Sequence, residues 1–128
     1  MKQLKLKYSS IIPFPGFYAI TLFGCIFRNW KYATSPIPAY IVNHEGIHAC
    51  EAEDFCKGFI GYCIFYILYF IEWILKCIIS LCTLFKVRAY RSISFEQEAY
   101  INEKDLKYQD NRKRFAWTKY IFKLVWKK

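Results

Sequence analysis

Residues 44–48 have the sequence His44-Glu45-Gly46-Ile47-His48, an H-E-x-x-H pattern that contains both histidines of the chain. On an α-helix, residues four apart lie on the same face, so the two imidazoles project to one side. Two imidazoles placed in this way are typical ligands of Zn²⁺, and Glu45 can then reach a water on the open side of the metal. The alternative is a pair of ordinary histidines on the surface of a helix. We favour the metal site.

The flanking residues predict the helix that this site needs. Apolar or histidine side chains recur at steps of three and four at positions 41, 44, 48, 52 and 55, which is typical of one buried helix face. Pro36 or Pro38 suits the first turn. Glu51, Glu53 and Asp54 lie near the far end, and we expect them to form a solvated face.

A second helix is predicted to begin at Ser94. Ser94 and Gln97 have the spacing of a capping box, and the pattern after them continues to about Tyr108. A catalytic zinc site takes three protein ligands, so a residue beyond the H-E-x-x-H must contribute. Glu96 and Glu98 are both available. Glu96 shares its face with Ala99, and a small residue there permits close packing of two helices, so we favour Glu96 over Glu98.

Residues 59–85 are strongly apolar and contain only two charges, Glu72 and Lys76. Their spacing allows them to pair on a helix. The longest uncharged stretch, residues 58–71, is shorter than the roughly 20 residues of a bilayer span. We therefore predict one or two buried helices that cover the metal-binding helix. Contact with one side of a membrane stays open.

Composition limits the partners. The chain has 128 residues, 55% of them hydrophobic, and a net charge of +9, which fits one domain over residues 1–128 with affinity for an anionic partner. Residues 115–126 alternate apolar side chains with lysines, so we predict a C-terminal amphipathic helix that packs on the core or lies on an anionic membrane surface. No nucleic-acid-binding module is recognisable, and nucleic acid is an unlikely partner.

The N-terminal third predicts a small amount of β-structure. Residues 17–27 are rich in aromatic and β-branched side chains and are typical of one or two strands, after a turn at residues 11–16 that contains Pro13 and Pro15. The six cysteines form no C-x-x-C pair, and the first residues lack the features of a secretory signal. We expect reduced thiols and a cytoplasmic location, with membrane association left open.

An H-E-x-x-H followed by a helical Glu96-Gln97-Glu98-Ala99 resembles the gluzincin branch of zinc metallopeptidases, in particular the small single-domain members called minigluzincins, and also small uncharacterised zincin-like proteins. The resemblance implies His44, His48 and Glu96 as zinc ligands and Glu45 as general base. In several gluzincin families an Asp or Asn stands four residues after the ligand Glu and braces a histidine. Here that position is Tyr100.

The sequence therefore predicts an α+β, mostly helical zincin-like domain. It would have N-terminal β-structure, a metal-binding helix, long apolar helices, a third-ligand helix and the C-terminal amphipathic helix. The predicted function is zinc-dependent hydrolysis of a peptide or protein substrate, with Arg88, Arg91 or Tyr100 as alternatives for stabilising the oxyanion. The competing hypothesis is a non-catalytic membrane-associated or interaction protein with a structural or degenerate site. The sequence does not indicate the oligomeric state.

Overall fold

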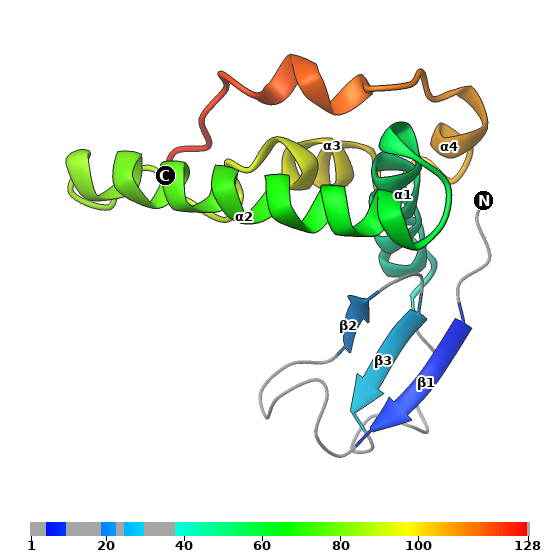
Figure 1. The fold of residues 1–128 in the computed structure, drawn as a ribbon. Coiled ribbons are helices and arrows are strands. Elements are labelled where there is room, and N and C mark those ends of the chain that lie inside the picture. The colour runs from blue at the N-terminus through cyan, green and yellow to red at the C-terminus, as the bar shows by residue number, and fades with distance from the viewer. Residues whose placement is uncertain (1–4, 10–18, 23–24, 30–37, 128) are drawn as a thin grey trace.

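The computed structural model describes residues 5–9, 19–22, 25–29 and 38–127 (Figure 1). The predicted turn at residues 11–16 lies outside these ranges. Three short strands are followed by the helical part of the chain. The elements are β1 (Lys5–Ser9), β2 (Ala19–Leu22), β3 (Cys25–Asn29), α1 (Ala39–Phe55), α2 (Phe59–Cys82), α3 (Ser94–Asn102), α4 (Tyr108–Asn111) and the 3₁₀ helix η2 (Ala116–Tyr120).

The predicted α+β class is wrong. Between residues 38 and 127 the chain consists of helices and loops, apart from one isolated bridge between Val87 and Trp126, and these helices supply the described core. The strands form a separate small sheet in the order β1-β3-β2, with β1 parallel and β2 antiparallel to β3. The hydrophobic core of the described residues is formed by the helical part of the chain, without a residue from these strands. The described architecture is therefore helical.

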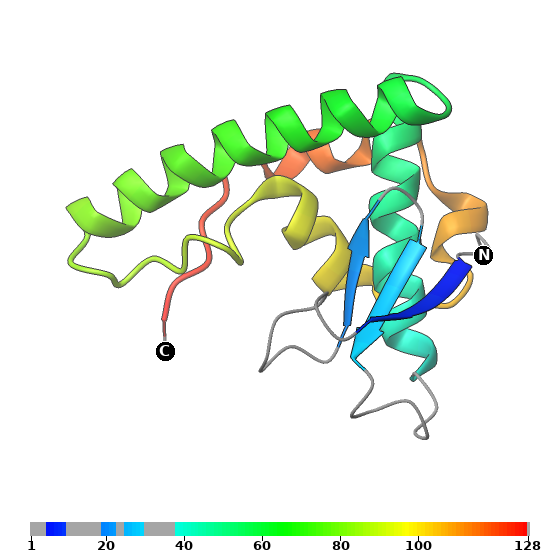
Figure 2. The same ribbon diagram turned by 60° about the horizontal axis from the view of Figure 1, so that its bottom comes forward.

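The core lies between α1, α2, α3 and η2. Ala52, Phe65, Ile93 and Phe95 are buried at its centre, and Trp117 packs against them. Figures 1 and 2 show α2 crossing the C-terminal end of α1 at a steep angle.

Gly61 permits the close crossing of α1 and α2. A Cβ at this position would collide with the backbone oxygen of Cys56 and lie 2.8 Å from that of Ala52. The absence of a side chain therefore lets the first turn of α2 rest directly on the end of α1.

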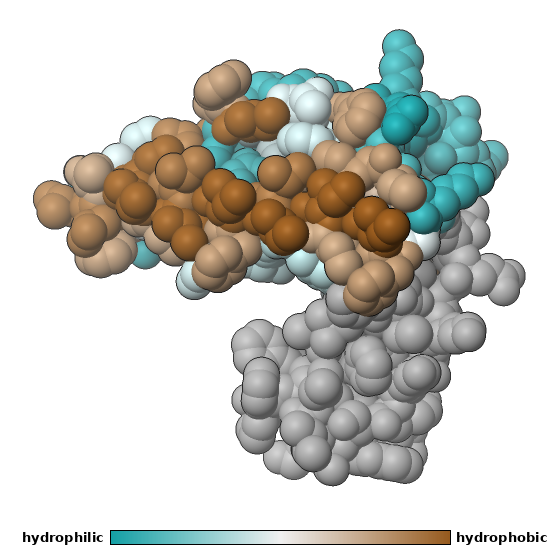
Figure 3. All heavy atoms as spheres, viewed as in Figure 1, coloured by the Kyte–Doolittle hydropathy of each residue, from teal (hydrophilic) through white to brown (hydrophobic). Residues whose placement is uncertain are grey.

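The prediction that residues 59–85 are buried is wrong for α2. Seven of its large apolar side chains are more than half exposed to solvent: Phe59, Ile60, Ile67, Phe70, Leu75, Ile78 and Leu81. In Figure 3 they belong to a continuous brown band along the length of the helix. The charges have the opposite orientation, because Lys76 is buried and Glu72 faces α3. By length and composition α2 could cross a membrane, and it is the one such helix among the described residues.

The start of α3 is stabilised by a residue of α2 rather than by the predicted capping box. Glu72 accepts hydrogen bonds from the backbone N–H of Ser94 at 2.7 Å and from its hydroxyl at 2.6 Å. Gln97, the expected partner of Ser94, instead donates to the backbone oxygens of Ser92, Tyr120 and Lys123. A carboxylate at a helix N-terminus is favoured by the helix dipole, so the tertiary contact replaces the local one.

α3 ends at Asn102, six residues before the predicted end. The side-chain amide of Asn43 donates to the backbone oxygens of Asn102, Glu103 and Asp105. These oxygens are therefore satisfied by α1 rather than by further helical turns.

The predicted amphipathic helix at residues 115–126 is also wrong. Only Ala116–Tyr120 is helical, in the 3₁₀ form, and the chain then runs beside residues 86–88. Lys76 donates to the backbone oxygens of Ile121 and Lys123. Side chains from α2 and α3 thus take the carbonyl groups that a longer helix would use itself.

Candidate metal centre

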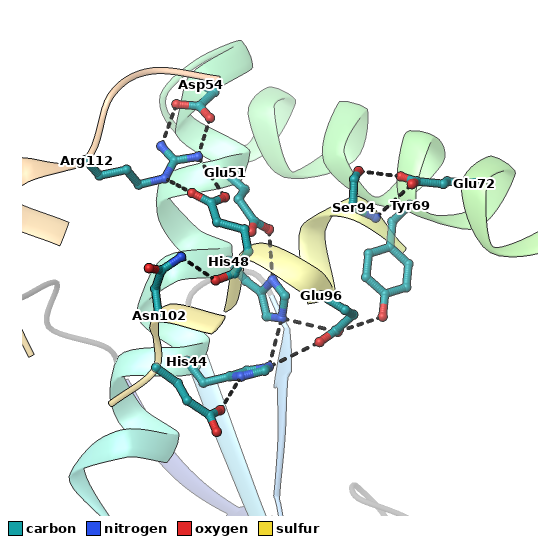
Figure 4. Close-up of polar contacts among 12 residues, drawn as sticks. His44, His48, Glu51, Asp54, Tyr69, Glu72, Ser94, Glu96, Asn102 and Arg112 are labelled. Carbon is teal, nitrogen blue, oxygen red and sulfur yellow. Dashed lines mark hydrogen bonds and ion pairs between the residues drawn. The ribbon is translucent and has the colours of Figure 1, made fainter. Parts of the chain in front are cut away.

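Donor atoms of three side chains, from two helices, lie close together. The Nε2 atoms of His44 and His48 lie 3.2 Å apart, and Glu96 places Oε2 3.2 Å from His44 and Oε1 3.2 Å from His48 (Figure 4). This group is the one cluster of three metal-ligating side chains found among the described residues. Four-coordinate zinc with bonds of about 2.0–2.2 Å separates its ligand atoms by roughly 3.3 Å. The spacing of the three donors therefore fits Zn²⁺.

A carboxylate holds the far side of each imidazole. Nδ1 of His44 lies 2.8 Å from Oε2 of Glu103, and Nδ1 of His48 lies 2.9 Å from Oε2 of Glu51. Each Nδ1–H donates to its carboxylate, which turns Nε2 toward the centre of the cluster. Metal-binding histidines commonly have such partners, which fix the ring and raise its basicity.

The two glutamates of α3 have different surroundings. Glu96 is 3% exposed, and its Oε1 accepts a hydrogen bond of 2.8 Å from the Tyr69 hydroxyl of α2. Glu98 is fully buried but points away from the histidines, toward Arg112, whose guanidinium joins Glu98 to Asp54. The structure thus brings Glu96, and not Glu98, to the histidines.

The cluster is electrostatically coupled. Burial alone would lower the pKa of His48, but the carboxylates of Glu96 and Glu51 outweigh burial and raise it well above its usual value. Burial would raise the pKa of Glu96, yet the charge of His48 and hydrogen bonds from both histidines lower it. Burial raises the pKa of Glu51, and the neighbouring Glu98 adds to the effect. Positive charge is therefore favoured between these carboxylates, at the place where a metal cation would replace a proton.

Glu45, the residue after His44 on α1, interacts electrostatically with Tyr90. It is half-buried on α1, and its charge contributes to raising the pKa of Tyr90, after the larger effects of burial, Glu96 and Tyr100. Tyr90 is therefore near both Glu45 and Glu96, and its side chain is 47% exposed.

Of the three residues considered for the oxyanion, Tyr100 contacts the cluster and Arg91 contacts Tyr100. The ring of Tyr100 contacts the ring of His44 edge-on, with centroids 4.6 Å apart. The guanidinium of Arg91 lies over the Tyr100 ring at 3.8 Å. Arg88 is exposed. The sequence did not single out Tyr90, the neighbour of both carboxylates.

Gly46 admits a residue from α4 that braces the site. A Cβ on Gly46 would lie 2.5 Å from Nε2 of Gln109, which donates a 2.7 Å hydrogen bond to Oδ1 of Asn43. Asn43 in turn holds the loop that carries Glu103. The glycine inside the motif therefore makes room for the contacts that place Glu103 against His44.

The sequence did not predict the carboxylates that bond to the two histidines, Glu51 and Glu103. Glu51 and Asp54 are 0% and 5% exposed, although we expected them to be solvated. Glu103 belongs to a charged segment with no distinguishing pattern. The spacing of His48 and Glu51 on one helix was the only available signal, because residues three apart are neighbours on a helix.

Comparison with known proteins gave no match. No family model matches the sequence, and no curated protein or solved structure matches the chain. The likeness to gluzincins consequently stays a hypothesis about the residues that carry it.

Proposed function

We propose that the protein is a zinc-dependent peptidase in which His44, His48 and Glu96 bind Zn²⁺ and Glu45 is the general base. The observation that carries the proposal is the convergence of three side chains: the two Nε2 atoms lie 3.2 Å apart, and each lies 3.2 Å from one of the two carboxylate oxygens of Glu96. Its two histidines are oriented by carboxylates, and its third member is held by a tyrosine. Two imidazoles and one carboxylate form a ligand set used by catalytic zinc in peptidases.

When bound, the zinc would polarise the peptide carbonyl and make its water a nucleophile near neutral pH. The Glu45 carboxylate would accept a proton from that water and donate it to the leaving amine. Glu51 and Glu103 would hold the Nδ1 protons, so that both histidines keep Nε2 toward the metal. We assign the hydrogen bond to the substrate carbonyl oxygen to the hydroxyl of Tyr90, because Tyr90 interacts electrostatically with both Glu96 and Glu45 and is partly exposed.

The proposed substrate is a peptide or protein, and the proposed location is the cytoplasm, in association with a membrane. The length and apolar composition of α2 support the membrane association. A non-catalytic membrane-associated protein is the competing function, and the same exposed helix favours it. The two are separated by metal content and turnover rather than by membrane binding.

The deciding experiment is elemental mass spectrometry of the purified full chain, beside variants of the cluster. About one zinc per chain is expected, lost in His48→Ala and in Glu96→Ala. Glu98→Gln is the matched control, since Glu98 is on the same helix but bonds to Arg112. Absence of metal after reconstitution with zinc would remove the proposal.

Turnover is tested separately with a peptide library. Glu45→Gln is expected to keep its zinc and lose cleavage, because the amide cannot accept the proton. Cleavage at the unmodified rate would exclude Glu45 as the base. Zinc binding without cleavage in the unmodified protein would favour the non-catalytic alternative.

A further inference from the structure

The exposed face of α2 has a regular repeat. Aliphatic side chains recur at alternating steps of four and three, and each is 37% to 64% exposed: Ile60, Ile64, Ile67, Ile71, Ile74, Ile78 and Leu81. Figure 3 shows the band that contains this stripe, running from end to end of the helix. In the described part of the chain, no element covers it.

The opposite face of α2 carries the polar groups and points into the protein. Tyr62, Tyr69 and Lys76 are seven residues apart on this face. Tyr69 donates to Glu96, and Lys76 donates to backbone oxygens of the C-terminal segment. Glu72 bonds to the start of α3. An ordinary surface helix turns its polar face to water, so the polarity of α2 is reversed.

The residues that flank the stripe decide what would cover it. A repeat of fours and threes also occurs in coiled coils, where the flanking positions are commonly charged and set the choice of partner. Here those positions hold residues such as Cys63, Leu68, Phe70, Leu75 and Cys77, none of them charged. Phe70 and Leu75 are 56% and 54% exposed, and a narrow helix–helix seam would leave them in water. Lipid would cover the stripe and its flanks together.

We infer that the outer face of α2 binds an anionic lipid bilayer, with the helix axis parallel to the membrane plane. The inference deepens the proposed membrane association and is independent of the zinc site. α2 has 24 residues and is about 36 Å long. An apolar helix face of this kind is buried roughly 5–10 Å into the boundary between headgroups and acyl chains.

The packing behind α2 favours this orientation over a membrane-spanning one. Ser80 bonds to the backbone oxygen of Val87, and Lys76 bonds to those of Ile121 and Lys123, so the segments around Val87 and residues 121–123 lie along the inner face of α2. Arg88 and Lys123 in these segments are exposed. If α2 crossed the bilayer, these charges would be drawn toward the hydrocarbon, at a large cost in free energy.

The charge of the protein specifies the kind of lipid. Lys57 and Lys86 are exposed just outside the two ends of α2, and the chain carries a net charge of +9. Lysines near the surface of an anionic leaflet each add to binding. The complementary surface is therefore a bilayer that contains acidic phospholipid.

Vesicle sedimentation tests the surface. The full chain is expected to bind vesicles of phosphatidylcholine with phosphatidylglycerol on the order of tenfold more tightly than vesicles of phosphatidylcholine alone at low salt. Ile67→Glu with Ile74→Glu should weaken binding on the order of tenfold or more. Ile101→Glu is the matched control, because Ile101 is 63% exposed on α3, away from the stripe, and should leave binding unchanged. Equal binding by all three proteins would overturn the inference.

Two further measurements close the alternatives. Spin labels at Ile60→Cys, Ile71→Cys and Leu81→Cys, in a background without native cysteines, should report equal depth in the bilayer. A label at Ile71 much deeper than the other two would show a spanning helix and overturn the parallel orientation. Sedimentation velocity without vesicles should show that the unmodified protein is a monomer. If that protein is instead a dimer that does not bind vesicles, and the dimer dissociates in the Ile67→Glu, Ile74→Glu variant, the stripe binds a second copy of the chain and the inference is overturned. Zinc content of every variant keeps failure of this surface distinct from failure of the metal site.

Discussion

Replacing Glu51 with glutamine tests whether the carboxylate behind His48 sets the affinity for zinc. Glu51 is fully buried, and its Oε2 accepts the hydrogen bond from His48 Nδ1 at 2.9 Å. Glutamine keeps the length and an acceptor oxygen but removes the negative charge. Loss of such a partner typically weakens metal binding by ~10- to 100-fold, which is about 1.4–2.8 kcal/mol. We expect the Kd for zinc, from competition with a chromophoric chelator, to rise by about 30-fold.

Glu53→Gln is the matched control for this change. Glu53 lies two residues further along α1 and lines a hollow beside Asp54 and Arg112 instead of the metal cluster. The Kd of the Glu53→Gln variant for zinc should stay within about twofold of that of the unmodified protein, because the substitution is away from the site. An unchanged Kd in folded Glu51→Gln would refute the assignment of Glu51 as the partner that tunes His48.

Three other substitutions give further predictions. Gly61→Ala should lower the free energy of unfolding in urea by ~1–3 kcal/mol, because the new Cβ meets the backbone of Cys56. Gly46→Ala should lower it by less, because the Cβ there meets only the flexible end of the Gln109 side chain. A larger loss for Gly46→Ala than for Gly61→Ala would contradict the packing described. Glu72→Ala removes the cap of α3 and should cost ~1–2 kcal/mol, seen as a fall in Tm, whereas an unchanged Tm would mean that the cap adds nothing. Tyr90→Phe should keep its zinc and lose ~100-fold in kcat, the usual effect of removing one oxyanion donor; an unmoved kcat would exclude that role.

The sequence predicted the helix of the motif and the residues that meet on it. Pro38 directly precedes α1, and the four-residue spacing of His44 and His48 brings their Nε2 atoms to 3.2 Å. The preference for Glu96 over Glu98 was based on Ala99, which is fully buried in the structure. These inferences depend on local helical geometry, which spacing alone defines.

The supporting residues could not be predicted because their roles come from tertiary contacts. Glu51 and Glu103 have the composition of solvated charges, and only the folding of the loop after α3 brings Glu103 to His44. The exposure of α2 was missed for a related reason. Composition shows how apolar a helix is, but not which side its neighbours occupy, and here they gather around Glu72 and Lys76.

The hydrogen bond from Tyr69 to Glu96 has a mechanical consequence. Tyr69 is on the inner face of α2, opposite the exposed apolar stripe, and its hydroxyl lies 2.8 Å from an oxygen of the third candidate ligand. If α2 rolled about its long axis, Tyr69 would swing sideways and pull on Glu96 or release it. A change in the orientation of α2 would therefore act on the geometry of the site through this phenol.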